Sequence, residues 1–245
     1  MLDRPRSPTS PPALAATPAG GAGPAEDQPA VEVVNPEGRA PVLLLCDHAG
    51  RRIPTWLGGL GLPGHELARH IAFDIGAAEV TRGLARLLDA PAVLCHVSRL
   101  VIDPNRLPGD PASIPAVSDG TVVPGNQELG PAEVRRRRAY AFVPYHRTVA
   151  RQIARLRRRH GVPALISLHS FSPSLGGVAR PWAVAVLWDE DTRLAAPVLA
   201  GLRRDPALAS APTSPTRAAS RSATRYLSMR RAAACRTSPS SSART

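Results

Sequence analysis

The sequence predicts an α/β fold, a three-layer αβα domain with a mostly parallel or mixed central sheet and a disordered tail at each end. Between about residues 31 and 205, short apolar runs of strand length alternate with amphipathic helical segments. That alternation is typical of a parallel sheet covered by helices on both faces. In addition, two of the apolar runs end in a His followed by residues that favour turns, as expected where strands open into a crevice.

Five segments are predicted to be strands. The first is an edge strand, and the run at 42–45 is continuously apolar, as in a strand covered on both faces. The run ending at His169 is likewise predicted to be buried. The five segments are residues 31–34, 42–45, 92–97, 162–169 and 182–188.

Helices are predicted between these strands. Residues 65–74 have helical character, and Val80, Leu84, Leu87 and Leu88 form the apolar stripe of a helix over 77–88. After an irregular Pro- and Gly-rich stretch (108–130), a helix should begin near Pro131, since proline is favoured at the first helical position. Pro144 should break or kink it. Two further helices are predicted over 145–160, with Val149, Ile153 and Leu156 on one stripe, and over 192–203.

Composition separates the chain into three regions. Residues 1–30 are rich in Pro, Ala, Gly and Ser, and 206–245 in Arg, Ser and Ala; both are predicted to be disordered tails flanking an α/β domain at 31–205. The net charge is +12, and every basic residue is Arg. Seven of these arginines lie in 206–245, which has no acidic residue. Residues 206–245 therefore supply +7 of the net charge, and the rest of the chain supplies only +5.

The three cysteines indicate a reducing compartment. Their number is odd, no CxxC spacing occurs, and Cys46 and Cys95 lie in strand-like runs where a free thiol acts as a small apolar group. No apolar run approaches the ~18 residues of a membrane span, and the N-terminus has no apolar signal-peptide core. We expect a cytoplasmic protein without a membrane partner. No feature of the sequence indicates an oligomeric state.

His48 and His169 are the strongest candidates for metal ligands. Each follows an apolar run, so parallel strands would bring both imidazoles to the same edge of the sheet. A neutral imidazole is a good zinc ligand, and a catalytic zinc uses three protein groups and a water molecule. The alternative is that each His only caps its strand by binding backbone. Two His at matched strand ends favour the metal site.

Several motifs follow one another along the chain, at 42–54, 70–77 (His-Ile-Ala-Phe-Asp-Ile-Gly-Ala), 98–106, 144–146 and 168–171. In this order they resemble the N-formylglutamate amidohydrolase family. The resemblance covers roughly residues 40–203 and implies a fold like that of zinc-dependent exopeptidases. It also implies a metal-dependent amidohydrolase that cleaves the amide C–N bond of a small N-formyl or N-acyl amino acid such as N-formylglutamate, in amino-acid catabolism. The cofactor implied is Zn²⁺, with another divalent metal as the alternative.

The resemblance leaves the third metal ligand open. Zinc exopeptidases of the carboxypeptidase type often supply a Glu three residues after the first His, where this chain has Arg51. Asp74, in the Asp-Ile-Gly-Ala motif, is the preferred substitute. Asp47 is the alternative.

The loop after the third strand carries the expected substrate clamp. Asp103, Asn105 and Arg106 form this clamp, and the Asn105–Arg106 pair resembles the terminal-carboxylate site of carboxypeptidases. Arg99 is expected to bind the second carboxylate. A guanidinium can grip a carboxylate through two hydrogen bonds. The alternative is a surface turn held by an Asp–Arg pair. His146 and Ser170 are further substrate-binding candidates, although His146 is nearly as well explained by helix capping.

No catalytic base is identified, and the tail suggests why. Family members typically continue with Gly-Asp-Asn-Glu-Pro-Tyr-Ser-Gly and later Ile-Glu-Ile-Arg, and we expect the base to be a Glu of those motifs. Residues 211–218 and 234–243 can be encoded by codons that, one base earlier, give Gly-Ala-Asn-Glu-Pro-Tyr-Ser-Gly and Gly-Leu-Pro-Asp-Val-Ala-Val-Glu-Leu-Arg. A frameshift near 205–211 is therefore a hypothesis for this tail, and Glu190 matches no motif.

Two other functions stay open. A catalytically inactive, frameshifted family member would keep the fold and lose the base. A nucleic-acid binder is suggested by the Arg runs at 135–138 and 157–159. These runs lack interleaved aromatics for base stacking, so we expect solvated helix faces and no nucleic-acid partner.

Overall fold

The structure, a computed structural model, describes residues 29–175, 178–180, 183–188 and 191–205. The predicted tails lie outside this part of the chain, except for Pro29 and Ala30. Glu190, Cys235 and the two stretches with alternative reading frames also lie outside it. The disorder and the frameshift therefore stay predictions.

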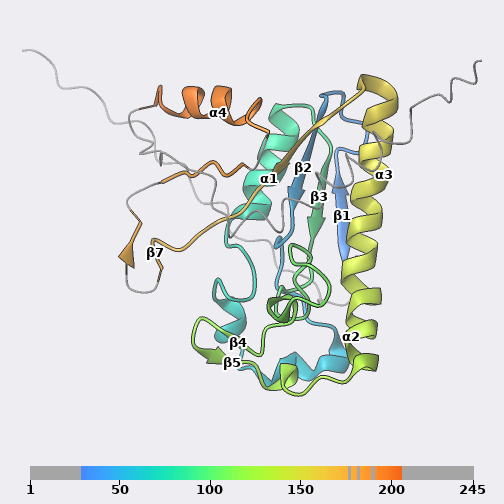
Figure 1. Cartoon of the computed structure of the whole chain (residues 1–245), viewed down its shortest axis with the longest axis vertical. Coiled ribbons are helices and arrows are strands. Elements are labelled where there is room, and N and C mark those ends of the chain that lie inside the picture. Colours follow the sequence, from blue (N-terminus) through green and yellow to red (C-terminus); the bar gives the residue numbers. More distant parts are fainter. Residues whose placement is uncertain (1–28, 176–177, 181–182, 189–190, 206–245) are drawn as a thin grey trace, which may run out of the picture.

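A mixed four-stranded sheet forms the centre of the described domain, as the sequence predicted (Figure 1). The strand order is β1-β3-β2-β6, where β2 runs parallel to both neighbours and β1 is antiparallel to β3 at one edge. The strands are β1 (Val31–Val34), β2 (Val42–Cys46), β3 (Ala92–Cys95) and β6 (Ala164–Ser167). The carboxyl ends of β3, β2 and β6 consequently meet at one edge of the sheet.

Two apolar layers sandwich this sheet, because side chains alternate across a strand. On one face, Leu43 and Leu45 of β2 pack with the long helix α3 (Val143–His160), which contributes Val149 and Leu156. On the other face, Leu44 and Cys46 pack with α1 (Ala77–Leu87). The helices lie on opposite sides of the sheet in Figure 1, which gives the predicted three layers.

Helix α1 forms where expected but buries a different face. Its buried residues are the small ones, Ala77, Ala78, Thr81 and Ala85, whereas Val80 and Leu87 of the predicted stripe are 56% and 82% exposed. Thr81 donates its hydroxyl to the carbonyl of Ala77 at 2.7 Å, so it can be buried without an unpaired polar group. Small side chains permit a close approach of the helix to the sheet. The prediction that the apolar stripe is the buried face of this helix was therefore wrong.

Pro144 distorts the second helical region without ending it. Helix α2 (Pro131–Arg137) begins at the predicted proline and continues through a π-helical turn, η5 (Arg138–Phe142), into α3. Proline has no N–H to give to the carbonyl four residues earlier, and a π turn just before it accommodates that lost bond. The stripe of α3 is as predicted, since Val149 and Leu156 are fully buried and Ile153 packs against the same core.

Three other segments differ from the sequence predictions. Residues 65–74 contain only the short 3-10 helix η2 (Glu66–Ala68) among turns. Strand β6 is half-buried and lies at a sheet edge within the described residues, so it is not covered on both faces. The described part of the fifth predicted strand, 183–188, forms no strand, because only one isolated bridge residue occurs there.

The remaining elements are short. Helix α4 (Ala195–Leu202) lies within the last predicted helix, and β7 (Ser174–Leu175) pairs with β8 (Val178–Ala179). The others are 3-10 helices η1 (Thr55–Gly61), η3 (Pro111–Ser113) and η4 (Pro124–Asn126), and the hairpin of β4 (Val117–Ser118) with β5 (Thr121–Val122). No helix in the described ranges has the length and apolarity needed to cross a membrane.

The irregular stretch after β3 is anchored by a buried arginine. Arg137 is 1% exposed and donates to Asn126 Oδ1 at 2.6 Å and to the carbonyl of Gly125 at 2.8 Å. Asn126 in turn donates to the carbonyls of Leu100 and Pro115, both at 2.8 Å. These hydrogen bonds therefore tie the long loop to helix α2 and to the segment that follows β3.

Candidate metal centre and substrate cleft

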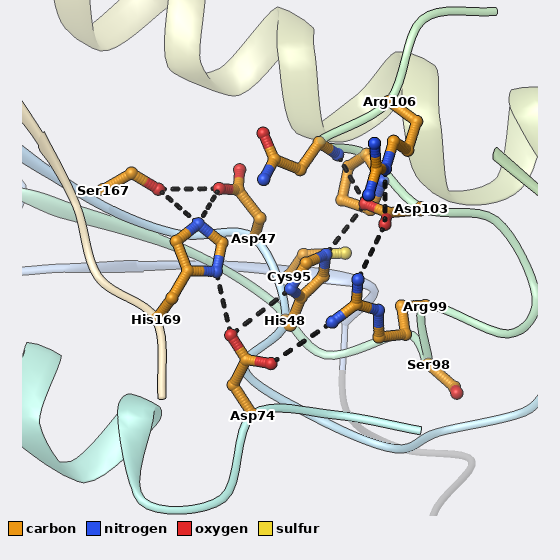
Figure 2. Close-up of polar contacts among 12 residues, drawn as sticks. Asp47, His48, Asp74, Cys95, Ser98, Arg99, Asp103, Arg106, Ser167 and His169 are labelled. Atoms are coloured by element: carbon orange, nitrogen blue, oxygen red, sulfur yellow. Dashed lines mark hydrogen bonds and ion pairs between the residues drawn. The ribbon is translucent and has the colours of Figure 1, made fainter. Parts of the chain in front are cut away.

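Polar side chains from four separate segments meet at the carboxyl edge of the sheet (Figure 2). His48 follows β2, His169 follows β6, and the loop after β3 brings Arg99 and Asp103. Asp74 lies just before α1, where its backbone N–H donates to the carbonyl of His48 at 3.0 Å. Ligand sites in open α/β sheets lie at this edge, where the sequence predicted that the two His residues would meet.

Asp74 lies between the two imidazoles. Its Oδ2 atom is 3.3 Å from Nδ1 of His48 and 2.8 Å from Nδ1 of His169. One ligand atom from each of these three residues lies within 4.8 Å of the others. His48 and Asp74 are buried, and the side chain of His169 is 34% exposed. The structure thus brings the three predicted metal ligands together, with access from the His169 side.

Each imidazole also contacts a carboxylate through its other nitrogen. Nε2 of His48 lies 2.8 Å from Oδ1 of Asp103, and Nε2 of His169 lies 3.2 Å from Oδ2 of Asp47. Both carboxylates are almost fully buried. Metal-binding His residues usually donate their second ring N–H to such a group, which fixes the ring and its tautomer.

These carboxylates strongly favour the charged imidazoles. Burial alone would lower the pKa of His169, but hydrogen bonds to Asp47 and Asp74 and their charges raise it to about 10. For His48, burial is likewise outweighed by Asp103 and Asp74, so its pKa is raised. Burial would raise the pKa of Asp74, but the two His hold it below its ordinary range. A cation binding beside Asp74 must therefore displace protons from the rings.

The donor set fits a divalent cation such as Zn²⁺. Two imidazole nitrogens and one carboxylate oxygen are among its preferred ligands, and three protein ligands leave a position for water. Asp47, the alternative third ligand, is fully buried and faces Nε2 of His169, the side away from Asp74. Asp74 is the carboxylate that both Nδ1 atoms share.

A cleft of about 230 Å³ adjoins this centre. Arg99, Asp103 and Arg106 line one part of it, and residues 117–119 of the β4–β5 hairpin line another. Arg99 connects the cleft to the centre, because its guanidinium lies 3.5 Å from Asp74 Oδ1 and 3.2 Å from Asp103 Oδ2. The cleft therefore places two guanidinium groups near the candidate ligands, together with the carboxylates of Asp103 and Asp119.

The other predicted substrate-binding residues have mixed positions. Arg106 is 39% exposed in its side chain and lies 3.8 Å from Asp103, whereas Asn105 uses its backbone N–H to hold the Asp103 carboxylate at 2.8 Å. Nε2 of His146 lies 3.0 Å from the carbonyl of Pro104, so His146 braces the loop. Ser170 follows His169 and is half-buried.

Two residues of the centre were not predicted from the sequence. The hydroxyls of Tyr145 and Ser167 both donate to the Asp47 carboxylate at 2.7 Å. The helical spacing of Tyr145 from Val149 was the available signal, because it places Tyr145 on the stripe that faces the sheet. Ser167 is two residues before His169 and therefore points to the same side of its strand.

Gly50 permits the tight turn after His48. A Cβ atom at this position would lie 2.5 Å from the carbonyl oxygen of His96 and 2.8 Å from its Cα. The chain then pairs with the segment after β3, since Arg52 donates to that same carbonyl at 3.0 Å. The glycine after the predicted ligand thus allows two backbone segments to approach closely.

Known proteins with similar sequences and structures were compared with this chain. The curated N-formylglutamate deformylase of Pseudomonas aeruginosa is 28% identical over 156 residues, 54% of this chain and 53% of that protein. The chain thus matches about half the length of this relative. The crystal structure of gene product Atu2144 from Agrobacterium tumefaciens is 38% identical, with a TM-score of 0.70 over 75% of this chain and 72% of that one.

A family model extends this likeness across most of the domain. The model described as N-formylglutamate amidohydrolase matches residues 40–215, which include β2, β3, β6 and all the polar side chains at their carboxyl ends. The match covers well over half of the 245 residues. With its motifs in order on this sheet, the chain belongs to the N-formylglutamate amidohydrolase family.

Proposed function

We propose that this protein is a metal-dependent amidohydrolase that cleaves the amide C–N bond of an N-formyl amino acid with an acidic side chain, such as N-formylglutamate. The observation that carries the proposal is the contact of Arg99 with Asp74, which joins the candidate ligands His48, Asp74 and His169 to a cleft lined by two guanidinium groups. Family membership supports the reaction class.

Three side chains would hold the metal. His48 and His169 offer Nδ1, and Asp74 offers a carboxylate oxygen within 4.8 Å of both. A divalent cation bound there would polarise the scissile carbonyl and lower the pKa of a water molecule. The carboxylates of Asp103 and Asp47 orient the two rings through Nε2.

Arg99 and Arg106 would anchor the substrate. N-formylglutamate has two carboxylates, and both guanidinium groups border the same cleft. Arg106 is the freer of the two, since its shortest contact with Asp103 is 3.8 Å. Arg99 is held by Asp74 and Asp103, so it can place one carboxylate at a fixed position relative to the candidate ligands.

A proton acceptor remains to be supplied. Within the described residues, the carboxylates of the centre, Asp47, Asp74 and Asp103, all contact an imidazole. We keep the proposal that the base is a Glu of the family's C-terminal motifs and that a frameshift near 205–211 replaced it here. Sequencing the coding DNA from about residue 195 past the stop tests this directly. The proposal would be overturned if the DNA encodes the present tail and no neighbouring reading frame encodes Asn-Glu-Pro-Tyr.

The activity test uses the full chain with N-formyl-L-glutamate and Zn²⁺, and follows formate release by NMR. We expect formate release by a chain carrying the restored C-terminal frame and much weaker release by the chain with its present tail. The release should stop with EDTA, return with Zn²⁺ and be much weaker with N-formyl-L-leucine. The His48→Ala variant is the matched inactive control. No release by a zinc-loaded chain, with release by a chain carrying the restored C-terminal frame, would assign the loss to the tail. No release by either would overturn the proposed function.

The nucleic-acid alternative has less support in the structure. In the Arg run at 135–138, Arg137 is buried, Arg136 stacks on Trp56 at 4.3 Å from the ring centroid, and Arg138 lies over Phe142 at 6.0 Å. Three of its four charges thus serve contacts within the fold. Tight DNA binding that weakens steeply with added salt would favour this alternative.

A further inference from the structure

We propose that Asp47 is a positioning residue, which Tyr145 and Ser167 hold so that it keeps a proton on Nε2 of His169 and leaves Nδ1 to bind a divalent cation. This role deepens the proposed function and rests on it. Asp47 follows β2, Ser167 ends β6 and Tyr145 lies near the start of α3, so three elements build one cradle.

The sheet register places Asp47 beside His169. Leu45 of β2 pairs with Ser167 of β6 in parallel register, and Leu168 donates to the carbonyl of Leu45 at 2.8 Å. Asp47 and His169 are each two residues further along their strands. Side chains two residues apart point to the same side of a strand, so the cradle lies on the face that α3 covers.

Both oxygens of the Asp47 carboxylate make contacts within this cradle. Oδ1 accepts from the Tyr145 hydroxyl at 2.7 Å, and Oδ2 accepts from the Ser167 hydroxyl at 2.7 Å and faces Nε2 of His169 at 3.2 Å. Asp47 and Tyr145 are both 0% exposed. A carboxylate held from two sides and closed off from solvent is suited to orient a ring and is poorly placed to take a cation itself.

The surrounding atoms determine which nitrogen of His169 carries the proton. Ser167 Oγ lies 3.1 Å from Nε2, but its only hydrogen goes to Asp47. Both neighbours of Nε2 are therefore acceptors, and Nε2 must be the donor. If a cation took the place of the proton on Nδ1, the ring would be neutral and its Nδ1 lone pair would bind the cation. That nitrogen faces Asp74, whose Oδ2 atom lies 2.8 Å away.

The decisive measurement is the tautomer of His169 in the zinc-loaded, ¹⁵N-histidine-labelled full chain, assigned with a His169→Gln variant. We expect Nε2 to carry a proton and Nδ1 to show the shift of a zinc-bound nitrogen. Binding through Nε2 would overturn the proposed role. The tautomer is read from the wild-type chain, and the variant serves only to assign the signal.

Zinc affinity gives a second, independent readout. Competition with a chromophoric chelator should show Zn²⁺ binding weakened about 10-fold or more in Tyr145→Phe and in Ser167→Ala, in the range known for partners of metal-binding His residues. Tyr140→Phe, at a tyrosine that packs edge-on against Trp56, is the matched control and should bind as the wild type does. Circular dichroism checks the fold of each variant.

The outcomes separate the two levels of the hypothesis. If the wild-type chain binds no Zn²⁺, the metal-dependent function and the role of Asp47 fail together. If it binds Zn²⁺ but folded Tyr145→Phe and Ser167→Ala bind as tightly, only the role of Asp47 fails.

Discussion

His48 and His169 turn the same ring nitrogen, Nδ1, toward one oxygen of Asp74, with their ring centroids 5.1 Å apart. The two residues come from different strand ends, and the carboxylate comes from the segment before α1. Because these candidate ligands come from three separate segments, a metal site built from them depends on the tertiary fold and on each of the three residues.

Removing either imidazole should therefore remove metal binding. We expect His48→Ala and His169→Ala to weaken Zn²⁺ binding by at least about 100-fold, because a catalytic zinc uses three protein ligands and only two would remain. Equilibrium dialysis followed by metal analysis measures this. His65→Ala is the matched control, since the side chain of His65 is 77% exposed. Full zinc retention in His169→Ala would contradict the assignment.

Arg106 should affect substrate binding more than turnover. The Arg106→Lys variant keeps the charge but loses the planar pair of donors. In the chain with the restored C-terminal frame, we therefore expect KM for N-formylglutamate to rise about 10-fold with a smaller change in kcat. Arg86→Lys, at an exposed residue of α1, serves as the control. Equal KM values for wild type and Arg106→Lys would show that Arg106 is not part of the clamp.

The stability of the metal-free chain should fall as the solution becomes alkaline. The folded pKa of His169 is raised from 6.5 to about 10, so its contribution is complete below pH 6.5 and is lost as pH rises through 10. The lowered pKa of Asp74 acts on the acid side, where stability is lost as pH falls below 3.8. Thermal unfolding in EDTA from pH 5 to 10 measures the alkaline decline. The decline should be shallower in His169→Gln, and an identical slope would contradict the shift.

Truncating a buried leucine and an exposed leucine of the two helical layers should change the free energy of unfolding by different amounts. Leu156 of α3 is fully buried, so Leu156→Ala should reduce the free energy of unfolding by about 2–5 kcal/mol. Leu87 of α1 is 82% exposed, so Leu87→Ala should change it by no more than about 0.5 kcal/mol. Urea denaturation of both variants makes the comparison. A large loss in Leu87→Ala would mean that another surface covers α1 in solution.

The buried thiols should be inert in the native protein. Cys46 and Cys95 are free and buried, and burial raises the pKa of each thiol to about 12. Since the thiolate is the reactive form, we expect no labelling by a disulfide reagent at pH 8 in a Cys235→Ser variant. Both thiols should react at once in guanidinium chloride. Rapid native labelling of either residue would show that the sheet opens readily.

The sequence by itself determined the layers and the edge where the chemistry lies. The apolar runs at 42–45 and 162–169 marked two parallel strands, and a His after each run must reach the carboxyl edge that they share. Pro131 marked the start of α2, and the stripe through Val149 and Leu156 marked the buried face of α3. These features depend on local periodicity and backbone restriction, which a sequence carries directly.

Only the tertiary structure decided which side chains meet. Asp103, expected to hold substrate, lies against Nε2 of His48, and Tyr145, next to the predicted His146, is the residue that reaches Asp47. The buried face of α1 also differs from its apolar stripe, because the sheet accepts small side chains there. Contacts between residues far apart in the chain depend on register and on the space between layers. A one-dimensional pattern specifies neither, so the ring orientations in the centre could be known only from the folded chain.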